Sequence, residues 1–260
     1  MALLVGAAVG SVLRDGGETD RVLPLELTFL TELFAGGDSV HPAFRTWLNT
    51  CDFAVGWLQD TERAVLNTLR TLGVHRLCVQ SPSSSDLLSE HQAARYLEVL
   101  DATNVSRVKN QPLILLPSVR ERGRQILYRL NRSHQQRLVV IHPGSGSVHK
   151  CMEASRFATV IEWLSSEGTF PVLLEGPSDD ESVGQVLRSL RMTVPVLRDL
   201  DLSMAAAVLS HAELYLGHDS GMTHLAAALS IPTIACFGPT NPRRWAPLGR
   251  TVSILTGTPC

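Results

Sequence analysis

The chain has 260 residues, of which 44% are hydrophobic and 18% are charged, and its formal net charge is −2. This length and hydrophobic content suit two domains with substantial cores. A near-neutral chain without clustered Lys and Arg does not fit a general nucleic-acid binder, so we expect no nucleic-acid partner.

The chain opens with the apolar run MALLVGAAVGSVL, which has no basic residue in front and is too short to span a bilayer. We therefore predict neither a signal peptide nor a membrane span, and expect a soluble protein. The five cysteines form no CxxC pair and are odd in number. This pattern argues against a disulfide framework or a zinc site and favours a reducing cytoplasm.

Helices and strands alternate through the first half of the chain. Hydrophobic periodicity predicts a helix over 23–34, a strand over 52–57, a helix over 61–72 ended by Gly73, a strand over 74–79, and helices over 84–100 and 119–130. The polar stretch NRSHQQR at 131–137 is typical of a linker. We therefore place one domain over 1–131 and a second over 132–260.

The alternation is more regular in the second half. Apolar runs predict strands over 138–141, 171–174, 194–197, 214–216 and 233–237, and amphipathic segments predict helices over 153–166, 180–190, 202–210 and 222–229. Fully apolar strands between helices indicate a parallel sheet covered on both faces. Ligands bind such sheets at the carboxyl ends of the strands, so the loops that follow the strands are expected to carry the function.

The first of these loops is HPGSGSVHK, residues 142–150. Its glycines and serines allow backbone amides to approach an anion, and Lys150 adds a positive charge. It lacks the Walker A pattern. Phosphate binding and an ordinary strand-to-helix turn with an exposed lysine both remain open at this point.

Two further loops also leave alternatives open. In EGPSDDES, residues 175–182, the acidic cluster is suited to capping the next helix, although one carboxylate could instead hold ribose hydroxyls. In FGPTNPRRW, residues 237–245, Thr240, Arg243 and Arg244 could reach an anion, or the loop could be a rigid surface turn.

The loop GHDSGMTH, residues 217–224, favours a ligand site. Asp219, Ser220 and Gly221 stand where a helix begins, so its first amides can meet a diphosphate, and Gly221 removes a side chain that would block close approach. His224 lies one turn further and can point to the same edge. A Ser220–His224 hydrolase pair is disfavoured, because the GxSxG pattern is absent from the sequence.

HPGSGS with its lysine, EGPSDDE and GHDSGMTHLAAALSIPTIACFGPTNPRRWAP together resemble the donor-binding half of glycosyltransferase family 9, the heptosyltransferase-like family. The resemblance is strong over 138–247 and weaker before it, where DFAVGW and the helix–strand rhythm agree. The motifs D-[ST]-G-x-x-H-x-x-A-A and F-G-P-T, close together and in order, are specific for that family. The resemblance implies an α/β protein of the GT-B type, with two Rossmann-like domains of parallel sheet across a cleft, the N-terminal one incomplete.

The resemblance also implies an activity. The domain 132–260 would bind a nucleotide sugar, ADP-heptose in the best-known members. An inverting transfer, with neither a bound metal nor a cofactor, would move the sugar to a lipopolysaccharide-type or other glycan acceptor, with the domain 1–131 on the acceptor side. A lipid-linked acceptor would bring the protein into peripheral contact with the inner membrane.

The matching positions imply the site residues. Lys150 would pair with the donor phosphates, Glu181 or else Asp180 would contact the ribose, and Leu200 or Leu202 would line the adenine pocket. The implied donor site as a whole consists of Ser145, Ser147, Lys150, Asp180, Glu181, Leu200, Asp219, Ser220, Gly221, His224 and Thr240.

The first half departs from the family pattern. Family members open with a strand and a loop whose aspartate is the general base, whereas this sequence opens with LLVGAAVGSV, which resembles the family's second helix. Asp15 and Asp20 do not stand at a matching position, so the catalytic base is not identified. We expect that the chain begins late and stops early at Cys260, which a mass measurement of the native protein would test.

Two other classes remain. The chain could be a binding module that holds a nucleotide sugar without turnover, which the unidentified base favours. It could also be a GT-B sugar-nucleotide epimerase, which would need facing catalytic carboxylates that the sequence does not place.

Overall fold

The computed structural model describes residues 1–25, 29–82, 90–101, 103, 105, 111–130 and 135–257. The chain divides into two compact units: a larger one of Met1–Leu3, Ala8–Val22 and Asn110–Cys260, and a smaller one of Leu4–Ala7 and Leu23–Lys109. This division differs from the boundary predicted at 131/132, because Met1–Leu3, Ala8–Val22 and the segment from Asn110 onward group with the C-terminal part. The acceptor and donor roles of the domains stay predictions.

The larger unit contains a parallel sheet with the strand order β10-β9-β8-β5-β6-β7. Its strands are β5 (Leu138–His142), β6 (Phe170–Leu174), β7 (Val196–Leu197), β8 (Leu214–His218), β9 (Thr233–Phe237) and β10 (Val252–Thr256). From β5 the chain first runs outward to β7, and it then returns beside β5 to continue outward from β8. This is the order of a Rossmann sheet, and its switch point lies between β5 and β8.

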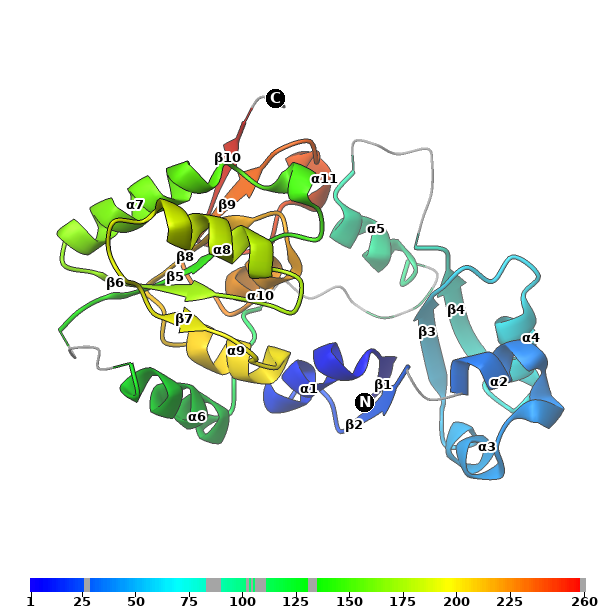
Figure 1. Cartoon of the computed structure of the whole chain (residues 1–260). Helices are drawn as coiled ribbons and strands as arrows, with labels where there is room; N and C mark the ends of the chain where they lie inside the picture. Colours follow the sequence, from blue (N-terminus) through cyan, green and yellow to red (C-terminus); the bar gives the residue numbers. More distant parts are fainter. Residues whose placement is uncertain are drawn as a thin grey trace. The chain divides into compact units, whose positions relative to one another are not determined.

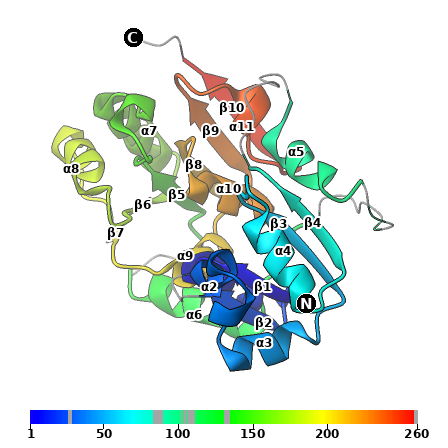
Figure 2. The same ribbon diagram turned by 90° about the vertical axis from the view of Figure 1, so that its right-hand side faces the viewer.

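Helices cover both faces of this sheet (Figures 1 and 2). Leu138 and Val140 of β5 pack in the core beneath α9 (Leu202–Leu209) and α10 (Gly221–Ala228). Val139 and Ile141 point to the other face, beneath α7 (Ala154–Ser166) and α8 (Asp180–Ser189). Side chains alternate between the faces of a strand, so a strand buried on both sides must be apolar throughout. The predicted doubly covered sheet is confirmed.

Two earlier helices complete the larger unit. Helix α6 (Pro117–Tyr128) packs along α9, and α1 (Ala7–Asp15) joins them through a cluster that includes Val12, Val119 and Ala206. Gly123 of α6 lies against the backbone of α9, where a Cβ would overlap the carbonyl oxygen of Ala207. A glycine is required here because the two helix backbones approach closely.

We therefore expect Gly123→Ala to lower the free energy of unfolding by about 1–3 kcal/mol, the usual cost of overpacking a core. Gly184→Ala in α8 is the matched control, because its Cβ would meet only the flexible guanidinium end of Arg188, at 3.2 Å. It should be neutral or stabilising by up to about 1 kcal/mol through helix propensity. Chemical denaturation of both variants measures this, and equal stabilities would contradict the close packing of α6 on α9.

In the smaller unit, β3 (Phe53–Trp57) and β4 (Arg76–Gln80) pair in parallel. Its helices are α2 (Phe29–Ala35), α3 (Pro42–Leu48), α4 (Ala64–Thr71) and α5 (Gln92–Glu98). A core that includes Leu33, Phe44 and Leu69 joins α2, α3 and α4 (Figure 1). The predicted helix over 61–72 and both predicted strands are confirmed, and Gly73 adopts the left-handed conformation typical of a helix end. Part of the helix predicted over 84–100 lies outside the described residues.

The beginning of the chain corrects two predictions. The segment LLVGAAVGSV, expected as one helix, contains strand β1 (Ala2–Val5) before α1, and β1 pairs with β2 (Arg21–Pro24). The helix predicted over 23–34 is wrong at its start, because residues 21–24 are this second strand, whereas Phe29–Ala35 form helix α2 as expected. Pro24 favours an extended chain before it, and strand pairing decides the rest.

Strand β10, helix α3 and the short helix α11 (Pro242–Trp245) were not predicted. Within the described residues, no helix combines the length and the hydrophobicity needed to cross a membrane.

Candidate functional site

The loops after β5 and β8 meet at the switch point of the sheet. Lys150 ends the short 3-10 helix η2 (Val148–Lys150), and its Nζ lies 2.8 Å from Oδ2 of Asp219. Ser145 Oγ donates to the carbonyl oxygen of Asp219 at 2.9 Å. The Asp219 side chain is 9% exposed and that of Lys150 30%, so the ammonium group is within reach of solvent at this edge. Two residues predicted for the donor site, 69 positions apart, are thus in direct contact.

His218, the last residue of β8, holds the segment after η2 through a hydrogen bond. Its Nε2 accepts a hydrogen bond from the backbone N–H of Met152 at 2.7 Å, and its ring packs edge-on against Phe157. Burial lowers the pKa of His218 to about 4, so the ring is neutral near pH 7 and keeps the lone pair that this bond needs. His218 therefore has a supporting role, holding the segment that follows Lys150.

A second histidine, His142, ends β5 and pairs with a carboxylate. Its Nε2 lies 2.9 Å from Oδ2 of Asp179, and both side chains are buried. Asp179 also accepts the backbone N–H of Gly176 at 2.9 Å. The hydrogen bond from His142 lowers the pKa of the Asp179 carboxyl and outweighs the effect of burial. A Cβ on Gly144 would overlap the Asp179 carboxylate, so this loop position requires glycine.

Helix α10 begins beside His142 of this pair. Ser220 is its N-cap residue, and Ser220 Oγ lies 3.5 Å from His142 Nδ1 and 3.2 Å from Thr223 Oγ1. A Cβ built on Gly221 would meet no atom of the described residues within 4 Å. The first amides of a helix lack intrahelical partners, and its N-terminus favours negative charge. The backbone of α10 is therefore open at Gly221, and the binding of an anion there stays a prediction.

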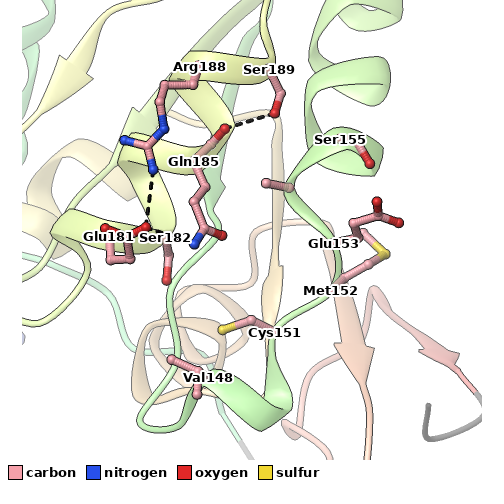
Figure 3. Close-up of a pocket in the computed structure, with 11 residues that line it drawn as sticks. Val148, Cys151, Met152, Glu153, Ser155, Glu181, Ser182, Gln185, Arg188 and Ser189 are labelled. Atoms are coloured by element: carbon pink, nitrogen blue, oxygen red, sulfur yellow. Dashed lines mark hydrogen bonds and ion pairs between the residues drawn. The ribbon is translucent and has the colours of Figure 1, made fainter.

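The predicted ribose contacts lie elsewhere on the surface. Asp180 and Glu181 are exposed at the start of α8, and Glu181 bonds Arg188 at 3.1 Å and Gln185 at 2.8 Å. Glu181 lines an open pocket of about 470 Å³ between α8 and the chain before α7 (Figure 3). The neighbouring Asp179 is the member of the acidic cluster that turns inward.

The remaining predicted residues occupy several environments. Ser147 caps η2 through its side chain. Leu200 and Leu202 pack against two different core clusters. His224 is exposed on α10, and Thr240 is half-buried, with an Oγ1 that finds no hydrogen-bond partner among the described residues. Their part in a donor site stays a prediction.

Sequence reasoning did not single out His142, Asp179, His218, Thr223 and Tyr215. His142 and His218 are polar ends of otherwise apolar strands, and that was the available signal. The Tyr215 hydroxyl lies 3.2 Å from Thr223 Oγ1, which in turn donates to the carbonyl of His218, so this buried network joins β8 to α10. In the part of the chain that the structure describes, no group of three or more His, Cys, Asp or Glu side chains is arranged to hold a metal ion.

A parallel sheet in Rossmann order, covered by helices on both faces, defines an α/β protein of the doubly wound class. Within that class the chain belongs to glycosyltransferase family 9 (heptosyltransferase), whose family model matches residues 55–259. The match extends well before the 138–247 segment on which the resemblance was strongest.

Curated relatives agree with this family. The chain is 33% identical over 117 residues to lipopolysaccharide heptosyltransferase 3 of Escherichia coli, covering 43% of this chain and 34% of the relative. It is 38% identical over 84 residues to lipopolysaccharide heptosyltransferase 1 of Pseudomonas aeruginosa, covering 32% and 23%. The chain thus spans about a third or less of the length of these relatives.

Solved structures share the fold. The E. coli ADP-heptose lipopolysaccharide heptosyltransferase II matches with a TM-score of 0.74 and 18% identity, over 98% of this chain and 80% of that one. An E. coli heptosyltransferase solved with ADP matches with a TM-score of 0.67 and 18% identity, over 97% and 82%. At these identities the likeness shows the fold alone, which is the predicted GT-B type.

Proposed function

We propose that this chain is a glycosyltransferase that moves a heptose-like sugar from a nucleoside diphosphate to a lipopolysaccharide-type or other glycan acceptor, with residues 132–260 as its donor-binding domain. The observation that carries the proposal is the contact of Lys150 with Asp219 beside the open start of α10. A cation and helix amides at one edge suit a diphosphate. The names of the family and of its relatives favour heptose as the sugar and ADP as the nucleotide.

The physical task of such a site is to stabilise the leaving group. Negative charge builds on the nucleoside diphosphate as the glycosidic bond breaks, and preorganised donors there lower the barrier. Lys150 and the first amides of α10 are placed to supply them. Asp219, in contact with Lys150 and Ser145, would face the sugar at the same site.

The finer features of the reaction are part of the proposal. We expect an inverting transfer without a bound metal, a catalytic base for the acceptor hydroxyl that is not yet assigned, and a cytoplasmic reaction with peripheral inner-membrane contact where the acceptor is lipid-linked. Asp15 does not fit the role of base, because its carboxylate contacts Ser203 and lies 3.4 Å from Arg122. A binding module without turnover is the second candidate, favoured by that unassigned base.

Thermal stabilisation by ADP, UDP, GDP and their sugar conjugates tests the donor site, in the parent and in Asp219→Ala and His224→Ala, with and without EDTA. We expect stabilisation by the adenine series that survives EDTA and weakens in both variants. Sugar transfer to an extracted glycan acceptor then separates an enzyme from a binding module. A folded parent that no nucleotide stabilises would contradict the proposal.

A further inference from the structure

Three residues from separate segments form a chain of contacts beneath the start of α10. Asp179 precedes α8, His142 ends β5, and Ser220 stands at the N-cap position of α10 without a side-chain capping bond. The imidazole bridges the other two, with Nε2 at 2.9 Å from Asp179 and Nδ1 at 3.5 Å from Ser220 Oγ. His142 is 4% exposed and Asp179 7%, whereas Ser220 is half-buried beside the open Gly221 position. The Asp179 end of this series of contacts is therefore buried, and the Ser220 end lies beside the proposed anion site.

The direction of the hydrogen bond between His142 and Ser220 depends on whether the His142 imidazole is protonated. Asp179 accepts from Gly176, so it acts as a carboxylate and takes the Nε2–H of His142. A neutral His142 then has a lone pair at Nδ1, which accepts the single hydroxyl hydrogen of Ser220. Ser220 would present only lone pairs to the site in that state, which repel a phosphate oxygen.

Protonation of His142 reverses the direction of its hydrogen bond with Ser220. Nδ1–H now donates to Ser220 Oγ, and the hydroxyl hydrogen can turn toward the site. Thr223 Oγ1 lies 3.2 Å from Ser220 Oγ but donates its own hydrogen to the His218 carbonyl, so toward Ser220 it is only a possible acceptor. The charged imidazole also lies near the place where a diphosphate would meet α10, and opposite charges favour each other's ionised forms.

We propose that Asp179 and His142 are positioning residues that couple binding of a diphosphate to uptake of a proton, with Ser220 as the group that touches the ligand. The inference rests on the proposed donor site. One proton passes from solvent to His142 when the ligand binds, no covalent bond of the ligand changes, and the proton returns when the diphosphate leaves.

Other titratable groups near His142 do not mimic this behaviour. His218 stays neutral because burial lowers its pKa to about 4, and burial raises the pKa of the Cys151 thiol above its ordinary value. Lys150 and Asp219 are paired with each other. His149 and His224 are exposed imidazoles on the flanking segments, so their variants must be part of the test.

The test is titration calorimetry with ADP-glucose between pH 6 and 8, in buffers of different ionisation enthalpy. Each phosphate of ADP-glucose carries one ester bond and shares the anhydride bond, so neither has an ionisation in this range and any proton taken up belongs to the protein. We expect the protein to take up a substantial fraction of one proton, up to about one, for each ligand bound. The affinity should then fall by up to about tenfold for each unit by which the pH rises. His149→Gln should leave this uptake unchanged.

Variants locate the proton. His142→Gln and Ser220→Ala should lose most of the uptake, and Ser220→Ala should bind about tenfold more weakly. Ser220→Thr keeps the hydroxyl and should retain both properties, which guards against a mere loss of folding, as does the circular dichroism of each variant. The proposed coupling would be overturned if proton uptake were equal in the parent, His142→Gln and Ser220→Ala, or if only His224→Gln lost it. Either result would leave the proposed donor site standing. A folded parent that binds no ADP-glucose would overturn both.

Discussion

Replacing Lys150 with alanine should weaken the binding of ADP by about ten- to a hundredfold, the usual range for the loss of a charge-assisted bond to a phosphate. The ammonium group is 2.8 Å from a nearly buried carboxylate. Its removal takes away a cation and also leaves the charge of Asp219 unopposed beside the ligand. Both effects act against a diphosphate.

Titration calorimetry with ADP measures this loss, with two further variants for comparison. Lys150→Arg keeps the charge but changes its geometry, so an intermediate affinity is expected. Arg156→Ala removes a cation from α7 whose side chain is 71% exposed and whose nearest acidic partner is 3.9 Å away, so binding should not change. An unchanged affinity in Lys150→Ala would remove Lys150 from the site.

Replacing Asp179 with alanine should give the largest loss of stability, about 3 kcal/mol or roughly 6–12 °C in melting temperature. The change leaves His142 buried without its carboxylate and removes the acceptor of the Gly176 amide. Asp180→Ala is the matched control next in sequence. That residue is exposed at the first position of α8, so only a favourable helix-dipole contact of about 0.5 kcal/mol is at stake.

The contribution of Asp179 should also depend on pH. The hydrogen bond from His142 lowers the pKa of the Asp179 carboxyl in the folded chain below the ordinary value of 3.8. The unfolded state therefore binds this proton more readily than the folded state. The stabilisation is therefore complete above the ordinary value and is lost as the pH falls below it toward the lowered one. Denaturation curves at neutral pH and near pH 3 should show the gap between parent and Asp179→Ala closing in acid. A gap that is equal at both pH values, or similar melting of the Asp179 and Asp180 variants, would contradict the buried pair.

The acidic cluster after β6 shows where sequence reasoning reached its limit. Asp179, Asp180 and Glu181 are adjacent and chemically alike, and the resemblance favoured the last two for ribose. In the structure Asp179 alone of these turns inward, because its partner His142 ends a strand 37 positions earlier. That choice depends on which loops the sheet brings together. Similarly, strands β1 and β2 form because each supplies the backbone hydrogen-bond partners of the other. The hydrophobic pattern of either segment alone does not reveal this pairing.

The sequence by itself determined the alternation of strands and helices in residues 138–237, the edge of the sheet where the loops after the strands gather, and the helix start at Gly221. These features follow from local causes, namely apolar periodicity, turn residues and free amides at a helix N-terminus. Only the tertiary structure decided the strand order, the contact of Lys150 with Asp219 and the chain from Asp179 through His142 to Ser220. Each of those joins residues far apart in sequence, and packing and pairing between distant segments select them, with no signal in either segment alone.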